Sequence, residues 1–96
     1  MTRVKCILAY DGSGFSGFQI QPKKRTVARE LETALKTIHK GQDIRLQSAG
    51  RTDAGVHAEG QVIHFDTTLT IPDENWKRAL NTLLPDDIYI KACKNA

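Results

Sequence analysis

Hydrophobic and polar positions follow two different periods in the first half of this chain. Residues 3–10, RVKCILAY, are rich in apolar residues and stop at an Asp-Gly pair, which predicts a mostly buried strand ending in a turn. After a loop, apolar residues recur at helical spacing, at Val27, Leu31, Ala34, Leu35 and Ile38. With Thr26 as N-cap and Gly41 as stop, this spacing predicts a helix over about 27–40.

The second half of the chain predicts two more strands, a helix and a final strand. Alternating apolar residues indicate strands over about 44–49 and over 61–67. Pro72 opens a second helix and Pro85 ends it; its apolar stripe comprises Trp76, Ala79, Leu80, Leu83 and Leu84. A last strand is marked by Ile88, Ile90 and Ala92. Because Trp76 belongs to the stripe, we interpret it as a core residue.

The predicted order of elements is β-α-β-β-α-β, which is the ferredoxin-like arrangement of an α+β protein. It implies an antiparallel sheet with two helices on one face. The opposite face is then open to a partner domain, a second chain or RNA. A length of 96 residues is consistent with one domain.

Charge is distributed unevenly along the chain, whose net charge is +3. Residues 1–40 contain eight Lys and Arg against three Asp and Glu, whereas residues 41–96 contain six against eight. The densest basic cluster, Lys23, Lys24 and Arg25, is able to bind phosphate groups, and it is equally typical of a solvated loop.

Cysteine usage and hydropathy point to a cytoplasmic protein. Cys6 and Cys93 fit neither a disulfide framework nor a zinc pattern, so we expect both to be reduced core residues. No apolar run approaches the ~20 residues that span a membrane, and the start, MTRVKC, does not resemble a signal peptide. The positions of His57 and His64 fit no standard metal site, so no metal is expected.

The glycines of the segment GSGFSG, residues 12–17, have the G-x-G-x-x-G spacing of a dinucleotide-binding turn. Such a turn needs a helix that begins within the motif, so that its N-terminus meets the pyrophosphate. Here the segment 18–25, which contains Pro22, intervenes before any helix begins. The glycines are therefore better interpreted as shaping an irregular loop, with Phe15 and Phe18 available to pack or stack.

The segment GRTDAGVHA, residues 50–58, joins two predicted strands and carries the candidate chemistry. Gly50 and Gly55 permit tight backbone paths on either side of Asp53. An aspartate is ionised at neutral pH, and Arg51 is able to steer a phosphate or pair with a carboxylate. The same residues also suit a hairpin loop in which the aspartate caps its own backbone. The residues alone leave both interpretations open.

The segment GRTDAGVHA resembles the signature of the TruA-type tRNA pseudouridine synthases. YDGSGFSGFQ, GQVIHF and NTLLPDDI resemble further segments of that family, in the same order along the chain. The resemblance implies that a uridine in the anticodon stem-loop of tRNA is detached at its N1–C1′ bond, turned over and rejoined through C5. Asp53 takes the position of the essential carboxylate, which attacks the sugar or the base or removes a proton from the sugar. No cofactor is implied.

The resemblance also implies a set of RNA contacts and a larger assembly. Arg51 would hold the RNA while the base is out of its stack, with Gln19 and His57 as further contacts. Their charge alone makes Lys23, Lys24 and Arg25 further candidates for contact with the RNA phosphates. The family's members are longer homodimers with a second domain, so we expect residues 1–96 to be the N-terminal domain, inactive by itself. Phe18 stands where the family usually has tryptophan.

Two other kinds of function compete with this interpretation. Ferredoxin-like RNA-binding modules stack bases on strand aromatics, for which the candidates here are Tyr10, Phe65 and Tyr89, although the usual motif of that class is absent. A structural or dimerising domain, with catalysis placed elsewhere, is the third interpretation.

Overall fold

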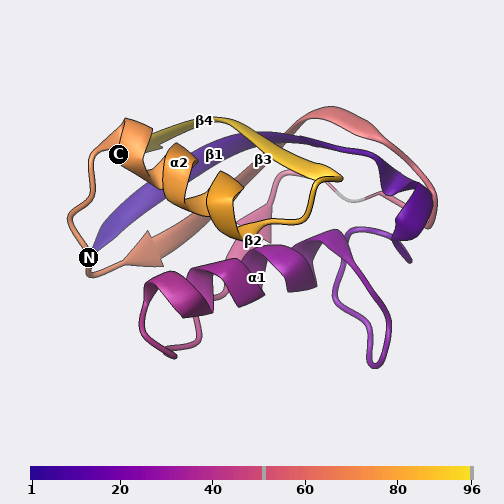
Figure 1. Cartoon of the computed structure of the whole chain (residues 1–96), viewed down its shortest axis with the longest axis horizontal. Coiled ribbons are helices and arrows are strands. Elements are labelled where there is room, and N and C mark those ends of the chain that lie inside the picture. Colours follow the sequence, from indigo (N-terminus) through magenta and orange to yellow (C-terminus); the bar gives the residue numbers. More distant parts are fainter. Residues whose placement is uncertain (51, 96) are drawn as a thin grey trace.

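The computed structural model describes residues 1–50 and 52–95, which form one four-stranded antiparallel sheet covered on one face by two helices (Figure 1). The elements in chain order are β1 (Thr2–Tyr10), a short 3-10 turn η1 (Gly12–Gly14), α1 (Val27–Ile38), β2 (Leu46–Ser48), β3 (Ala58–Thr67), α2 (Asp73–Leu83) and β4 (Ile88–Asn95). The spatial order of the strands is β2-β3-β1-β4. The predicted ferredoxin-like α+β fold is confirmed.

Strand β1 is central, and its side chains alternate between the helices and the open face of the sheet. Val4, Cys6, Leu8 and Tyr10 are buried under the helices. Arg3, Lys5 and Ile7 are exposed on the other face. Antiparallel pairing with β3 and β4 carries this alternation across the sheet, so that one face forms the core.

Helix α1 begins where the sequence predicts and ends two residues earlier than expected. The Thr26 side chain accepts a hydrogen bond from the Arg29 amide, as an N-cap does. At the other end His39 is the C-cap, and Lys40 and Gly41 both take positive φ angles, 56° and 94°. A left-handed turn of this kind ends a helix, which explains why the helical pattern stops short of residue 40.

Strands β2 and β4 differ in part from the simple alternation in the sequence. Strand β2 pairs with β3 only over Leu46–Ser48. At its start the Leu46 amide donates to the Glu32 carboxylate at 3.2 Å, and just beyond its end the Ala49 amide still donates to the Val62 carbonyl at 3.0 Å. In β4, Ile90 pairs with Leu8 and Ala92 pairs with Ile7, so one extra residue bulges between them. Because of the bulge, Ala92 is exposed and Cys93 points into the core. Of the three residues that marked the predicted strand, only Ile88 and Ile90 are therefore buried.

The core contains most of the residues that the two apolar stripes predict; Ile38 and Ala79 are half-buried, and Leu83 is exposed. Trp76 is completely buried and its ring lies edge-on to Phe65, whereas Leu83 is 43% exposed. Cys6 and Cys93 are free, buried thiols on neighbouring strands, with their sulfur atoms 2.9 Å apart. This burial confirms their prediction as core residues. Among the described residues, neither helix is long and apolar enough to cross a membrane.

A buried polar network joins the end of α1 to β3. His39 Nδ1 lies 2.7 Å from the carbonyl oxygen of Leu35, which can only accept, so Nδ1 carries the ring proton. His39 Nε2, 2.7 Å from Thr67 Oγ1, then accepts from the Thr67 hydroxyl. The same hydroxyl oxygen accepts from the Leu69 amide at 3.0 Å. The His39 ring also stacks on Trp76 of α2. The network therefore connects the end of α1 both to α2 and to β3.

Replacing Thr67 with valine is expected to lower the free energy of unfolding by about 1–3 kcal/mol, because it leaves one buried and one partly buried polar group without their partner. Those groups are His39 Nε2 and the Leu69 amide. Thr67→Ser is the matched control, since it keeps the hydroxyl and loses only a methyl group. Urea unfolding followed by circular dichroism measures both variants. A valine variant more stable than the serine variant would contradict this account of the network.

Candidate active site

Three loops meet at the end of the sheet opposite the chain termini (Figure 1). One is the glycine loop, residues 11–18, which follows β1. The second is the Asp53 loop, residues 52–57, which precedes β3. The third is the turn at 84–87 that precedes β4. Antiparallel strands bring these ends together because β1 ends where β3 and β4 begin.

The glycine loop packs directly against the Asp53 loop, and this contact is what its glycines permit. A Cβ atom on Gly12 would overlap the backbone carbonyl of Val56. A Cβ atom on Gly17 would lie 3.1 Å from the carbonyl oxygen of Thr52, and Gly17 has a φ of 96°, which other residues rarely adopt. The prediction of an irregular loop in place of a dinucleotide-binding turn is confirmed.

Hydrogen bonds hold both arms of the Asp53 loop on the glycine loop and β1. The Phe18 amide donates to the Thr52 carbonyl at 3.0 Å, and the Gly55 amide donates to the Phe15 carbonyl at 3.2 Å. The Tyr10 and Thr52 hydroxyls lie 2.7 Å apart. The position of Asp53 is therefore set from either side by main-chain contacts, which a surface loop of this length would otherwise lack.

The Asp53 side chain is exposed beside an open depression of about 430 Å³. Residues 16–19, Gln21 and Lys24 form its other walls, together with Thr52 and Ala54. Among the described residues, none donates a hydrogen bond to the Asp53 carboxylate; the Val56 amide, at 3.2 Å, donates to the Asp53 main-chain carbonyl. In the described part of the chain, the alternative in which this aspartate caps its own backbone therefore finds no support.

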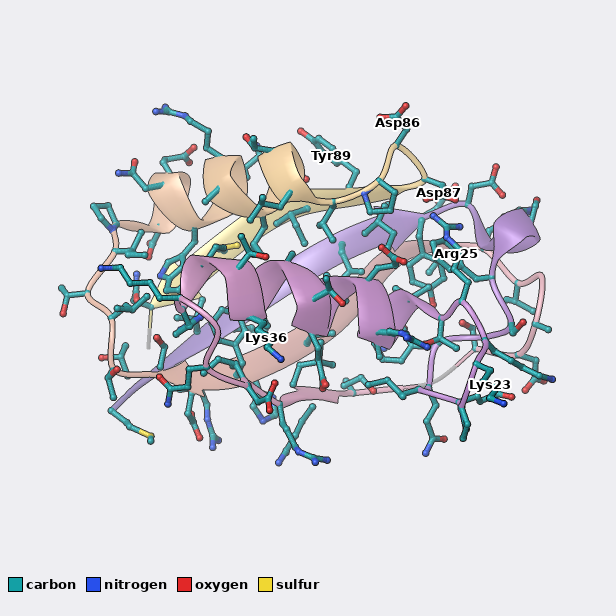
Figure 2. All side chains as sticks on the ribbon, turned by 60° about the horizontal axis from the view of Figure 1, so that its bottom comes forward. Lys23, Arg25, Lys36, Asp86, Asp87 and Tyr89 are labelled. Atoms are coloured by element: carbon teal, nitrogen blue, oxygen red, sulfur yellow. The ribbon has the colours of Figure 1, made fainter. Side chains whose placement is uncertain are left out.

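The basic cluster divides into two parts in the structure (Figure 2). Lys23 and Lys24 are exposed, and Lys24 lines the Asp53 depression. Arg25 instead forms a two-armed ion pair with Asp87, at 2.8 and 3.0 Å, and its guanidinium lies over the Phe15 ring. The hydrogen bonds from Arg25 lower the pKa of the Asp87 carboxyl, so this pair is ionised at neutral pH.

The remaining predicted site residues have different surroundings. His57 Nδ1 lies 2.9 Å from the Gly12 amide, which donates to it, and 3.1 Å from a carboxylate oxygen of Asp11. His57 therefore joins the Asp53 loop to the glycine loop, and its contact with RNA stays a prediction. Gln19 is exposed and lines the Asp53 depression. Arg51 lies outside the described residues. In the described part of the chain, no three potential ligands gather as a metal site.

Several residues that shape the site were not predicted as part of it. Asp87 was not among the predicted site residues, and its partner Arg25 lies 62 positions away in the sequence. Tyr10 was considered as a strand aromatic, whereas it is 4% exposed and contacts Thr52. A periodic pattern reports burial and gives no pairing between distant loops, so no signal in this sequence identified these contacts.

Comparisons with known proteins identify the family of this chain. The family model described as tRNA pseudouridine synthase matches residues 7–96. The chain therefore belongs to the tRNA pseudouridine synthase family. It is 66% identical over 91 residues to tRNA pseudouridine synthase A of Anoxybacillus flavithermus, and 64% identical over 91 residues to the protein of the same name from Oceanobacillus iheyensis. These matches cover 95% of this chain, but only 37% and 36% of the two relatives.

Proposed function

We propose that this chain is the aspartate-bearing part of an enzyme that converts uridine to pseudouridine in tRNA, with Asp53 as the essential carboxylate. The observation that carries the proposal is the exposed carboxylate of Asp53, on a loop fixed from both sides, beside a depression of about 430 Å³. An enzymatic carboxylate needs such a fixed position, because small displacements of a reacting group cost much of its rate.

The proposed reaction breaks the N1–C1′ bond of a uridine and forms a C5–C1′ bond, while a proton leaves C5 and a proton is gained at N1. Substrate and product have the same composition, so the step is an isomerisation. Asp53, ionised at neutral pH, attacks C1′, attacks the base, or removes a proton from the sugar. Each route requires that the nucleoside enter the depression beside Asp53, where Gln19 and Lys24 form part of the wall.

A uridine in a stem must leave its stack before it can reach Asp53, at a cost of a few kcal/mol. By its resemblance to the family, Arg51 is proposed to hold the RNA while the base is extruded. Lys23 and Lys24 are proposed to contact the tRNA backbone, which their exposure supports. His57 Nδ1 accepts a hydrogen bond from the Gly12 amide, so a hydrogen bond from His57 to RNA would use the other ring nitrogen, Nε2.

The whole activity is proposed to need more chain than these residues, because they span just over a third of the length of the matched relatives. We propose that residues 1–96 act as an N-terminal domain and that further segments complete the site. Assembly as a homodimer, a cytoplasmic location and action on the anticodon stem-loop are further parts of the proposal. They rest on the family resemblance.

The proposal is tested by incubating unmodified tRNA with the 96-residue chain and, separately, with a protein in which these residues are joined to the remaining two thirds of a relative. The longer protein is expected to form pseudouridine, measured by mass spectrometry after chemical labelling, and the 96-residue chain alone is expected to form at least about a hundredfold less. Equal rates would overturn the proposed need for further segments.

Product from neither protein, with tRNA binding retained, would instead favour a non-catalytic RNA-binding module. The structure offers little for that alternative. Of its three candidate aromatics, Tyr10 and Phe65 are buried at 4% and 1% exposure, and Tyr89 alone is open to solvent. Modules of that class stack two or three bases on their sheet, which a single exposed aromatic does not provide.

A further inference from the structure

All three guanidinium nitrogens of Arg25 face acceptor atoms of the protein. Figure 2 shows this side chain beside Asp87. Nη1 and Nη2 donate to the two carboxylate oxygens of Asp87 at 2.8 and 3.0 Å. Nη1 also donates to the Gly14 carbonyl at 3.3 Å, and Nε lies 3.9 Å from a carboxylate oxygen of Glu30. A guanidinium engaged in this way, beside two carboxylates, has little attraction left for a phosphate group.

The same side chain covers the glycine loop. The guanidinium carbon of Arg25 lies 4.1 Å from the centre of the Phe15 ring, close enough for a cation–π contact. The Ser16 amide donates to the Arg25 carbonyl at 2.7 Å, and the Asp11 amide donates to the Asp87 carbonyl at 2.9 Å. Main-chain and side-chain contacts thus attach the glycine loop both to the start of α1 and to the start of β4.

Phe15 connects this attachment to the Asp53 loop. Its carbonyl oxygen accepts from the Gly55 amide at 3.2 Å, two residues after Asp53. Its ring, 5% exposed, is held between Arg25 and Tyr10, and Tyr10 in turn contacts Thr52 through its hydroxyl. A shift of Phe15 would therefore move both arms of the loop that carries Asp53.

We propose that Arg25 and Asp87 are positioning residues for Asp53, acting through Phe15, and that Arg25 is not an RNA contact. This inference rests on the proposed function. The pair is partly exposed, with 39% and 29% of the two side chains accessible, so its contribution to overall stability is small. Its effect is on the geometry of the loop, where displacements of an ångström or less change a rate.

The test is a double-mutant cycle of Arg25→Gln, Asp87→Asn and the double variant, made in the longer protein and assayed on tRNA. Each single variant is expected to lower kcat about tenfold while KM for tRNA changes less than twofold, and the double variant is expected to be no worse than either. Arg29→Gln is the matched control, because it removes an exposed guanidinium one helical turn away. It is expected to leave kcat within twofold.

Asp87→Asn distinguishes a positioning role of Arg25 from an RNA contact by Arg25, because the Asp87 carboxylate does not itself bind phosphate. If Arg25 bound RNA, Arg25→Gln would raise KM and Asp87→Asn would leave kcat unchanged, and this pattern would overturn the proposal. Arg25→Lys keeps the charge and loses the two-armed geometry, so it is expected to share the loss of kcat.

Amide hydrogen exchange tests the positioning role without depending on catalysis. In the 96-residue chain, Arg25→Gln and Asp87→Asn are both expected to speed exchange at the Gly55 and Phe18 amides, with the β1 and β3 amides unchanged. Unchanged Gly55 exchange in both variants would overturn the positioning role even if pseudouridine is formed. Faster exchange at these amides, in a protein that forms no pseudouridine, would support the positioning role of Arg25 and Asp87 and would count against the proposed function.

Discussion

Asparagine in place of Asp53 is expected to abolish pseudouridine formation, by a factor of at least about 10³, while tRNA affinity stays within a few-fold of its original value. The amide is nearly the same size as the carboxylate and fits the same exposed position. It is neutral, so it can neither act as a base nor form a covalent bond to the sugar or the base. All three chemical routes proposed for Asp53 are therefore lost together.

The structure explains why binding should survive this replacement. Among the described residues, none donates a hydrogen bond to the Asp53 carboxylate, and the loop is held through the main chain and through Thr52, Gly55 and His57. Removing the negative charge also removes a repulsion from phosphate groups, which offsets any lost contact. The assay is single-turnover formation of pseudouridine in a tRNA transcript, with affinity measured by filter binding.

Asp86→Asn is the control for the Asp53 replacement, because Asp86 is an exposed carboxylate in the turn before β4 (Figure 2). It is expected to leave product formation within twofold. If Asp53→Asn retained a tenth or more of the original rate, Asp53 would not be the essential carboxylate. Loss of product together with loss of tRNA binding would point to an RNA contact instead.

The pattern of the sequence was sufficient to predict the elements and their order. Helix and strand geometry set the two periods, and burial of one face makes each period visible as apolar positions. The stripe through Leu31 and Leu35 and the alternation through Ile63 and Phe65 face the same core. The extra residue in β4 was not predictable, because a bulge depends on the register between two strands. Leu83 likewise fits the helical stripe, yet lies at its edge and remains exposed.

A candidate site could be predicted where a local sequence motif carries the residues of interest. Contacts between segments that are distant in the sequence could not be predicted. Asp53 lies in the segment that resembles the family, so a role could be proposed for it from the sequence. The ion pair of Arg25 with Asp87 joins two loops 62 positions apart, and no local pattern reports it. The three charges at 23–25 looked equivalent in the sequence, whereas the structure leaves two lysines exposed and engages the arginine.

Alanine at Gly12 is expected to displace the Asp53 loop, lowering kcat by about a hundredfold and the free energy of unfolding by about 2–3 kcal/mol. The added methyl group would overlap main-chain atoms of Val56, which cannot rotate out of the way as a side chain can. One of the two loops must move, and movement also breaks the bond from the Gly12 amide to His57.

Gly60→Ala is the control for this substitution, since a Cβ atom there would meet nothing within 4 Å and β3 accepts alanine without strain. Thermal melts first define a temperature at which both variants stay folded, and pseudouridine formation is then compared at that temperature. Because Gly12 does not line the depression beside Asp53 and the substitution leaves the carboxylate itself unchanged, a loss of rate in the folded variant reports the position of Asp53 separately from its chemistry. A Gly12→Ala rate within twofold of the Gly60→Ala rate would mean that the close approach of the two loops does not set the geometry of the carboxylate.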